Sequence, residues 1–208
     1  MSQSAEGVPG LELGGHRPLG LRERKKARTR AAVQEQALRL FREHGYAATT
    51  VEQIAAAAEI SPSTFFRYFP TKEDVVMYDA FDPLVIERFK AQPPELGPIG
   101  ALRAAVRETV ARLPAAAIAA QAERDELVTS VPELRARMMD ELGRSVQLLA
   151  ALVAERSGQA PGDLAATALA GAVIGVAIST WFGDASRAPA HRFERFDRGL
   201  ALLADGFG

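Results

Sequence analysis

The sequence predicts an all-α protein in which an N-terminal three-helix helix-turn-helix head precedes a C-terminal helical domain. Apolar residues recur with the helical period along most of the chain, and no convincing run of alternating strand residues occurs. Capping patterns mark the starts of several short helices in the first third of the chain. The charge is also uneven, because residues 1–72 carry a net charge of +4 and residues 73–208 carry −5. This division favours a polyanion-binding head on a body with another role.

Nearly half of the 208 residues are hydrophobic, which suffices for one large domain or for a small domain joined to a larger one. No cysteine is present, which excludes a disulfide framework, a thiolate metal site and a cysteine nucleophile, and fits a reducing cytoplasm. Residues 1–20 lack the apolar run of a secretory signal. We therefore expect a cytoplasmic protein with a disordered arm at 1–21, a head at 22–72 and a body at 73–208.

The head begins with a helix that the apolar spacing predicts over residues 22–44, and Gly45 ends it. Thr50 lies three residues before Gln53, which is the capping-box pattern. This pattern opens a short second helix with the sequence VEQIAAAA.

A third helix is predicted from Pro62 to about Phe69, with Ser61 as its N-cap. Pro62 fits the first helical position, where a missing N–H does no harm. Pro70 closes the helix, and Thr71 then caps a fourth helix.

The third helix distributes its residues over two faces, at 100° per residue. The face that we expect to anchor the head is aromatic and carries Phe65, Tyr68 and Phe69. The other side presents Ser63 and Arg67, with Thr64 and Phe66 at the flanks. Small polar residues let such a helix approach the DNA major groove closely, while Arg67 reaches base edges or phosphate.

The run RERKKARTR, Arg22 to Arg30, carries six basic residues and one acidic residue. Its position at the start of the first helix suits contacts with phosphates or with a neighbouring minor groove. Taken alone, such a run is often a solvated face, and an aromatic triplet at helical spacing is often ordinary core. Their combination with two capped short helices and a tight turn favours DNA binding.

The block GYAATTVEQIAAAAEISPSTFFRYFPTKEDVV resembles the DNA-binding head of the TetR family of one-component repressors. The resemblance implies that Thr49 and Thr50 lie near backbone phosphates, that the third helix enters the groove, and that Lys72 grips a phosphate. The residues expected to contact DNA are Arg24, Lys25, Lys26, Arg28, Arg30, Thr49, Thr50, Ser61, Pro62, Ser63, Thr64, Phe66, Arg67, Tyr68 and Lys72. The form TFFRYF is also similar to a subgroup that includes the mycofactocin-system regulator.

Two positions depart from the family pattern. Glu59 stands where the family usually has Gly, at a turn position that tends to need a positive φ. Phe66 stands where the family usually has a phosphate-contacting Tyr, and it has no hydroxyl for that bond. Either Tyr68 and Arg67 share this role, or Phe66 acts by packing.

The body is predicted to consist of longer helices. The first covers residues 75–90, with a bend at Asp82-Pro83, and the next covers residues 101–122, bent or split at Pro114. A second capping-box pattern, Ser130 to Glu133, opens a helix that runs to about residue 156. The last two helices are predicted over residues 164–182 and from residue 191 to near the end.

These last two helices offer apolar stripes for pairing with a second copy. The stripe of small residues on the first comprises Ala168, Gly171, Ala172, Gly175 and Ser179, and the stripe on the second comprises Phe193, Phe196, Leu200 and Leu203. The resemblance implies a homodimer with a four-helix interface that reads a palindromic operator in double-stranded DNA. The alternative is that both stripes are buried within their own subunit.

The resemblance also implies that helices between residues 75 and 156 enclose a cavity for a small apolar effector. The candidate lining residues are Met77, Phe81, Leu102, Val106, Val110, Ile118, Met138, Met139, Leu142 and Val146. The alternative for each is ordinary core. The subgroup resemblance would make the effector an acyl-CoA or a similar lipid. Its binding would lower operator affinity, with the helix at 75–90 as the lever.

Two other function classes remain as alternatives. An enzyme acting on lipids or isoprenoids would need a catalytic constellation, but His16, His44 and His191 lack metal-ligand spacing, and Glu123 with Asp125 has the pattern of a solvated turn. We therefore expect no catalytic activity, metal or cofactor. A membrane-anchored regulator rests only on the uncharged segment 164–182, which the sequence also explains as a buried helix.

Overall fold

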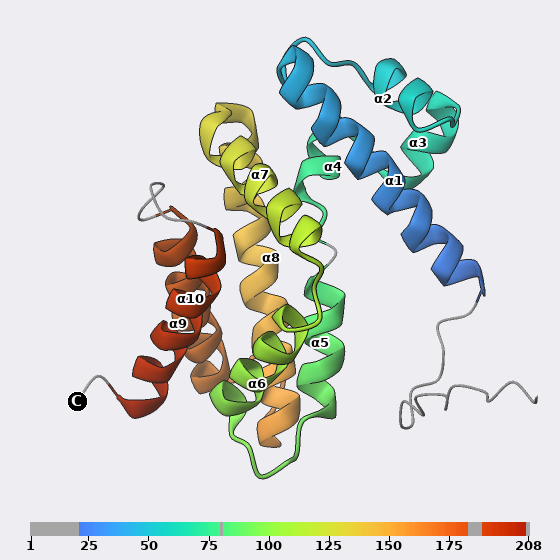
Figure 1. Ribbon diagram of the computed structural model, residues 1–208. Helices are drawn as coiled ribbons and strands as arrows, with labels where there is room; N and C mark the ends of the chain where they lie inside the picture. Colours follow the sequence, from blue (N-terminus) through green and yellow to red (C-terminus); the bar gives the residue numbers. More distant parts are fainter. Residues whose placement is uncertain (1–20, 80, 183–188, 207–208) are drawn as a thin grey trace, which may run out of the picture.

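The computed structural model describes residues 21–79, 81–182 and 189–206, so most of the predicted arm lies outside the described residues. Within these ranges the chain forms ten α-helices and no strand, as the sequence predicts (Figure 1). The helices are α1 (Leu21–His44), α2 (Val51–Ala57), α3 (Pro62–Tyr68), α4 (Lys72–Met77), α5 (Asp82–Ala91), α6 (Pro98–Val110), α7 (Ala115–Ser130), α8 (Pro132–Ser157), α9 (Leu164–Phe182) and α10 (Pro189–Asp205).

The short helices of the head begin at the predicted caps. Thr50 and Gln53 form a reciprocal capping box, in which the Gln53 N–H donates to Thr50 Oγ1 at 3.2 Å and the Thr50 N–H donates to Gln53 Oε1 at 2.8 Å. Ser61 Oγ accepts the Thr64 N–H at 3.1 Å and opens α3. Thr71 opens α4 in the same way. Local side-chain chemistry therefore fixes where each helix starts.

The turn between α2 and α3 has the unusual backbone that the sequence suggested. Glu59 adopts a φ of 55°, and it is the one described residue other than glycine with a positive φ. An L-residue with a side chain is disfavoured there, because its Cβ comes too close to the carbonyl oxygen that follows. The tight turn is thus formed at some conformational cost.

The single bent helix predicted over residues 75–90 is wrong, because the chain leaves the helical conformation between α4 and α5. Tyr78 has extended backbone angles, with φ −63° and ψ 114°, and ends α4. Pro83 then lies in the first turn of α5, where its missing N–H needs no helical partner. Pro114 likewise separates α6 from α7, which is one of the two outcomes expected there.

The predicted capping box at the start of α8 does not form. The Ser130 hydroxyl instead donates to the Leu127 carbonyl, 3.2 Å away in the last turn of α7. Val131 is the N-cap of α8 and gives no side-chain hydrogen bond. Because α7 continues up to Ser130, this side chain already has a partner in its own helix.

The described residues form two large apolar cores and a small third cluster between α8 and α9. The first joins α1–α4 to the facing ends of α7 and α8, and its fully buried side chains include Phe65 and Leu134. The second lies among α5, α6, α8, α9 and α10. Helix α8 contributes to both large cores, with Leu134 in the first and Leu152 in the second. It forms the central column of the body in Figure 1.

Helices α9 and α10 lie side by side at one edge of the body (Figure 1). Gly199 allows their close approach, because a Cβ built on it would lie 2.4 Å from Val176 Cγ1. The predicted stripe of α10 packs within its own subunit, with Phe196 and Leu200 buried in the second core and Phe193 and Leu203 packed against it. This is the alternative that the sequence left open.

The small-residue stripe of α9 is largely exposed, at Ala168, Gly171, Gly175 and Ser179. Nothing lies within 4 Å of a Cβ built on either glycine. Among the described helices none is both long and apolar enough to cross a membrane.

Candidate functional site

Helix α3 presents a polar and partly aromatic surface away from the first core. Ser61, Ser63 and Arg67 are exposed, whereas Phe65 is completely buried. Ser61 Oγ lies 2.9 Å from Ser63 Oγ and donates to Thr64 Oγ1 at 2.9 Å. The start of the helix is therefore a compact group of hydroxyls, next to the exposed Pro62.

Two aromatic residues flank this surface. Phe66 is 50% exposed and meets the buried ring of Phe65 edge to face, with 5.5 Å between the ring centroids. The Arg67 guanidinium lies over the Tyr68 ring, 5.3 Å from its centroid, and Tyr68 itself is half-buried. Phe66 is thus held by packing while its outer side stays available for contact.

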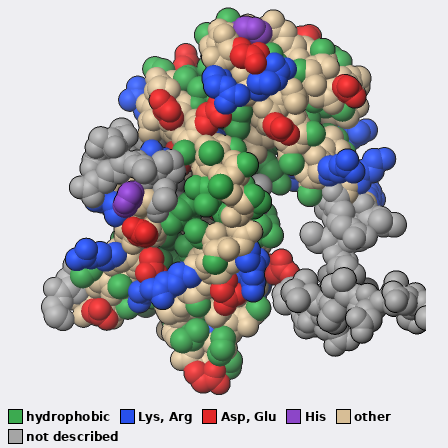
Figure 2. Space-filling model, viewed as in Figure 1, with side chains coloured by type: hydrophobic (Ala, Val, Ile, Leu, Met, Phe, Trp, Pro, Cys, Tyr) green, Lys and Arg blue, Asp and Glu red, His purple; other side chains and the backbone are tan. Residues whose placement is uncertain are grey.

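The basic run of the sequence forms the start of α1. Lys25, Lys26 and Arg28 are exposed there, and Figure 2 shows Lys and Arg side chains gathered at the end of the head where the described chain begins. Arg30 is half-buried instead, with its guanidinium 5.2 Å from the centroid of the Tyr78 ring. Arg24 lies in the same helix, and its side chain is outside the described part of the structure.

Two residues expected near phosphates are bound inside the head. Thr49 is only 1% exposed, and its hydroxyl donates to the Gly45 carbonyl at 2.9 Å. Lys72 Nζ donates to the carbonyls of Tyr46 and Thr49, at 2.8 and 3.0 Å, and lies 4.1 Å from the centroid of the Tyr46 ring. The Thr49 hydroxyl is therefore unavailable to a phosphate, and Lys72 ties α4 to the turn before α2. Thr50 remains exposed at the start of α2.

A cavity of about 370 Å³ lies in the body, within the size range of small-molecule sites. Figure 2 shows hydrophobic side chains gathered in the middle of this face, below the head. Seven of the predicted residues line the cavity, namely Met77, Phe81, Leu102, Val106, Val110, Met138 and Leu142. Side chains of α5, α9 and α10 also contribute, including Phe89, Val173 and Phe196.

Three of the predicted residues, Ile118, Met139 and Val146, do not line this cavity. Met139 is 63% exposed, since it follows the lining residue Met138 and is rotated by 100° around the helix. Val146 follows the lining residue Ser145 in the same way. The part of α7 that lines the cavity begins at Gln121, almost one turn after Ile118.

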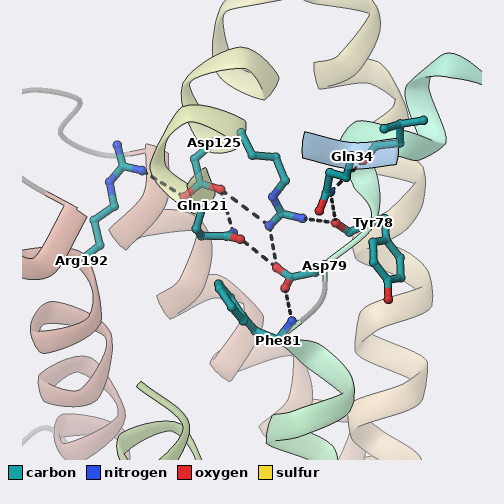
Figure 3. A network of polar contacts seen from close by, with 9 residues as sticks. Gln34, Tyr78, Asp79, Phe81, Gln121, Asp125 and Arg192 are labelled. Carbon is teal, nitrogen blue, oxygen red and sulfur yellow. Dashed lines mark hydrogen bonds and ion pairs between the residues drawn. The ribbon is translucent and has the colours of Figure 1, made fainter. Parts of the chain in front are cut away.

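A polar cluster borders the cavity where α4 passes into α5, and sequence reasoning missed it (Figure 3). Asp79 Oδ1 accepts the Phe81 N–H at 2.7 Å, and its Oδ2 accepts Arg124 Nη2 at 2.5 Å. Asp125 Oδ2 accepts Arg192 Nη1 at 3.0 Å. Gln121 Nε2 donates to Asp125 Oδ1 at 3.2 Å and lies 3.4 Å from Asp79 Oδ2. The cluster thus links α7, α10 and the α4–α5 junction.

Asp125 is buried, in contrast to the solvated turn expected from the sequence. It is 8% exposed, and burial raises its pKa to about 6 in spite of the nearby Arg124 and Arg192. Glu123, two positions earlier, points the other way and pairs with Arg42 at 3.0 Å. Residues two apart lie on opposite sides of a helix, so their spacing alone could not distinguish the two environments.

The same region joins the head to the body. Gln34 of α1 donates through Nε2 to the carbonyls of Val75 and Tyr78, at 2.9 and 2.7 Å. Arg124 Nη1 donates to the Tyr78 carbonyl at 3.1 Å. Tyr78 therefore receives one hydrogen bond from the head and one from the cavity wall. In the described part of the chain, no group of side chains is arranged to hold a metal ion.

Comparisons with known proteins agree on one family. The sequence profile described as the MftR C-terminal domain matches residues 96–208, which is more than half of the chain, and the profile described as bacterial regulatory proteins, tetR family, matches residues 34–77.

Among curated relatives, the chain is 42% identical over 96 residues to the HTH-type transcriptional regulator TcmR of Streptomyces glaucescens. That alignment covers 45% of this chain and 42% of TcmR, so the chain spans less than half of that relative. It is 27% identical over 169 residues to a candidate mycofactocin biosynthesis transcriptional regulator, MftR, of Mycobacterium tuberculosis, covering 78% of this chain and 84% of that protein.

Among solved structures, a candidate TetR-family regulator from Syntrophomonas wolfei has a TM-score of 0.57 at 17% identity, covering 86% of this chain and 95% of that one. The Thermus thermophilus FadR repressor, solved with lauroyl-CoA, has a TM-score of 0.49 at 24% identity, covering 85% and 94% of the two chains.

Proposed function

Because the chain belongs to the TetR family of transcriptional regulators, we propose that it is a homodimeric repressor that a small, mostly apolar effector releases from a palindromic operator. Residues 22–72 bind the DNA in the cytoplasm, and residues 73–208 bind the effector and the second subunit. The exposed surface of α3 is the observation that carries this proposal.

That surface matches what a major groove requires. The hydroxyls of Ser61, Ser63 and Thr64 lie at the start of α3 and are small enough for close approach to base edges or phosphates. Arg67 is exposed one turn further on, where its guanidinium reaches a guanine or a phosphate. The exposed ring of Phe66 replaces a hydroxyl contact by an apolar one, of the kind that a thymine methyl accepts.

The basic start of α1 supplies the sequence-independent part of the affinity. Lys25, Lys26 and Arg28 are exposed within about one turn near the start of α1, and neutralising phosphates with such side chains releases counterions from DNA. Thr50 adds a short polar contact at the start of α2. Thr49 and Lys72 support this surface from inside, since their polar atoms bind the backbone of the head.

A second copy would cover the exposed stripe of α9. Gly171 and Gly175 leave open space beside the helix, and Leu164 is 81% exposed at its start. Small residues at this spacing let two helices pack closely. A two-fold dimer places two copies of α3 in successive major grooves of a palindrome.

The cavity and the head share a hydrogen-bonded junction, which gives the effector a physical route to the DNA. Phe81 lines the cavity, and its N–H is held by Asp79, while Tyr78 is bonded to both Gln34 and Arg124. An effector that displaces Phe81 or Arg124 moves the segment that fixes α4 and hence α3. A ligand that binds better to the displaced arrangement lowers operator affinity by linkage.

Selection of bound sequences from random duplex DNA tests this proposal, with the wild type, Arg67→Ala and Arg112→Ala in parallel at a stated moderate salt concentration. Arg112 is an exposed arginine just after the end of α6 and serves as the charge-matched control. We expect a palindromic site for the wild type and for the control, and a preference relaxed at one position in each half-site for Arg67→Ala. Failure of the wild type to enrich any sequence would contradict the proposal.

A further inference from the structure

Charged side chains gather on one side of the otherwise apolar cavity. The described lining includes four acidic residues, which are Asp79, Asp82, Asp125 and Glu141, and a single cationic residue, which is Arg124. Because polar groups in a mostly apolar site fix the chemistry of the ligand, their individual partners decide which ligand the cavity accepts.

Arg124 uses both terminal nitrogens of its guanidinium to bind the protein, while its Nε is buried and has no hydrogen-bond partner among the described residues. Its side chain is 12% exposed, and its guanidinium donates to the Tyr78 carbonyl and to Asp79 and lies 3.8 Å from Asp125. An anionic ligand that recruited Arg124 would leave Asp79 without its charged partner. Breaking this largely buried ion pair would leave an uncompensated charge in the protein, which is strongly unfavourable. Among the described lining residues, no cation is therefore free to pair with an anionic group.

Two of the four acidic residues are already neutralised. Asp79 pairs with Arg124, and Asp125 pairs with Arg192 at 3.0 Å. Glu141 pairs with Arg144 one turn along α8, where both side chains are more than 40% exposed. Water weakens this surface pair, so Glu141 still contributes negative potential to the cavity.

Asp82 differs from the other three, because its carboxylate has no hydrogen bond or ion pair with any described residue. It lies in the first turn of α5, where it is exposed and lines the cavity. Surrounding protein and the carboxylate of Asp79 raise the pKa of Asp82, with Glu141 adding to the effect and Arg124 opposing it. A positive charge placed beside Asp82 would relieve this repulsion.

We propose that the effector is an apolar molecule that carries one amine or similar cationic hydrogen-bond donor, and that this group pairs with Asp82. The inference rests on the proposed function, in which the cavity is the effector site. The apolar walls, including Phe89, Leu102 and Val173, enclose the body of the molecule. An anionic acyl-CoA headgroup finds no free cationic partner among the described lining residues, so the lipid effector suggested by the subgroup resemblance is disfavoured.

A matched set of ligands tests this chemistry. We would measure the affinities of 2-(1-naphthyl)ethylamine, 2-(1-naphthyl)ethanol and 3-(1-naphthyl)propionate by isothermal titration calorimetry at neutral pH. The three share an apolar body and differ in the charge at one end. We expect the wild type to prefer the amine to both others by about tenfold or more, since hydrogen bonds to charged groups are the stronger ones.

Asp82→Asn should remove the preference for the amine and leave the affinity for the alcohol within about twofold, because only the charge is lost. Asp140→Asn is the control, since Asp140 is exposed on α8 and does not line the cavity. Equal binding of the carboxylate by the wild type, or an unchanged amine affinity in Asp82→Asn, would overturn the proposal.

Absence of binding by all three ligands would also overturn it, because the cavity would then fail as a binding site. Operator binding is measured with the same preparations. Intact operator binding in that case would leave the DNA-binding part of the proposed function standing, and only loss of operator binding would count against that part.

Discussion

Asp74 and Arg137 join the first turn of α4 to the long helix α8, with 2.8 Å between Asp74 Oδ1 and Arg137 Nη2. Asp74 Oδ2 also accepts the Thr71 N–H at 3.0 Å and so completes the capping box of α4. A single carboxylate therefore starts the helix behind α3 and holds it against the body. Loss of this carboxylate should lower the stability of the protein and shift the position of the head relative to the body.

The stability contributed by Asp74 should depend on pH. Partial burial opposes its ionisation, but the hydrogen bonds from Arg137 and Thr71 outweigh burial and lower the pKa of Asp74 below its usual 3.8. A lowered pKa in the folded state stabilises the protein above pH 3.8, and this contribution is lost as the pH falls through the folded value. Asp74→Asn should thus lower the free energy of unfolding by about 1–2 kcal/mol at neutral pH and by less in acid.

Urea unfolding at several pH values measures this difference. Asp205→Asn, at an exposed acid near the end of α10, is the control and should follow the wild type throughout. A difference between wild type and Asp74→Asn that stays constant down to about pH 3 would contradict the assigned role of the charge.

Glu59→Gly should stabilise the protein by about 0.5–1 kcal/mol, because glycine adopts the φ of 55° without the cost that a Cβ brings. Glu59→Ala retains a Cβ at this φ and separates the backbone effect from the loss of the charged side chain. Thermal and urea unfolding of the three proteins measures the difference. If the alanine and glycine variants were equally stable, the backbone of this turn would not be strained.

Gly199→Ala should destabilise the body by about 1–3 kcal/mol, because its Cβ would overlap the Val176 side chain on α9. The matched control is Gly143→Ala in α8, where nothing lies within 4 Å of the new Cβ and the gain in helix propensity should be stabilising. Chemical unfolding compares the two variants. A Gly199→Ala protein as stable as the wild type would show that α9 and α10 pack less closely than described.

Gly171→Leu tests the proposed pairing of α9 with a second copy. The leucine would project from an exposed position, so the fold of one subunit should persist while close helix–helix contact is blocked. We expect the dimer dissociation constant to rise by at least about tenfold in analytical ultracentrifugation. Ala116→Leu, at an exposed position of α7, should leave association unchanged. An unaltered dimer of Gly171→Leu would place the interface elsewhere.

Short-range features of the fold could be predicted because the partners are neighbours in sequence. Thr50, Ser61 and Thr71 cap their helices through groups three residues away, and these predictions are confirmed. The separation of α4 from α5 could not be predicted from neighbouring residues. It is stabilised by bonds from Gln34 and Arg124 to Tyr78, across 44 and 46 residues of sequence.

The lining of the cavity could likewise be predicted only in part from the sequence. Met138 and Leu142 are predicted as apolar residues of helices that the family resemblance assigns to the cavity. Met139 and Val146 are predicted on the same ground, although each lies one residue from a position that lines the cavity. No sequence pattern indicated the polar cluster, because Asp79, Asp125 and Arg192 come from three separate segments of the chain. Only the packing of α7 against α10 and the α4–α5 junction brings them together.

Lys72 changes how the ionic-strength dependence of DNA binding should be understood. Two of its three N–H donors bind carbonyls of the head, so its charge orders the protein before any phosphate is met. Removing Lys25 should lower the slope of log affinity against log salt by about 0.9, the value for one phosphate contact. Removing Lys72 should instead weaken binding at all salt concentrations with nearly the same slope. A count of basic side chains in the head therefore overstates the number of counterions that the operator releases.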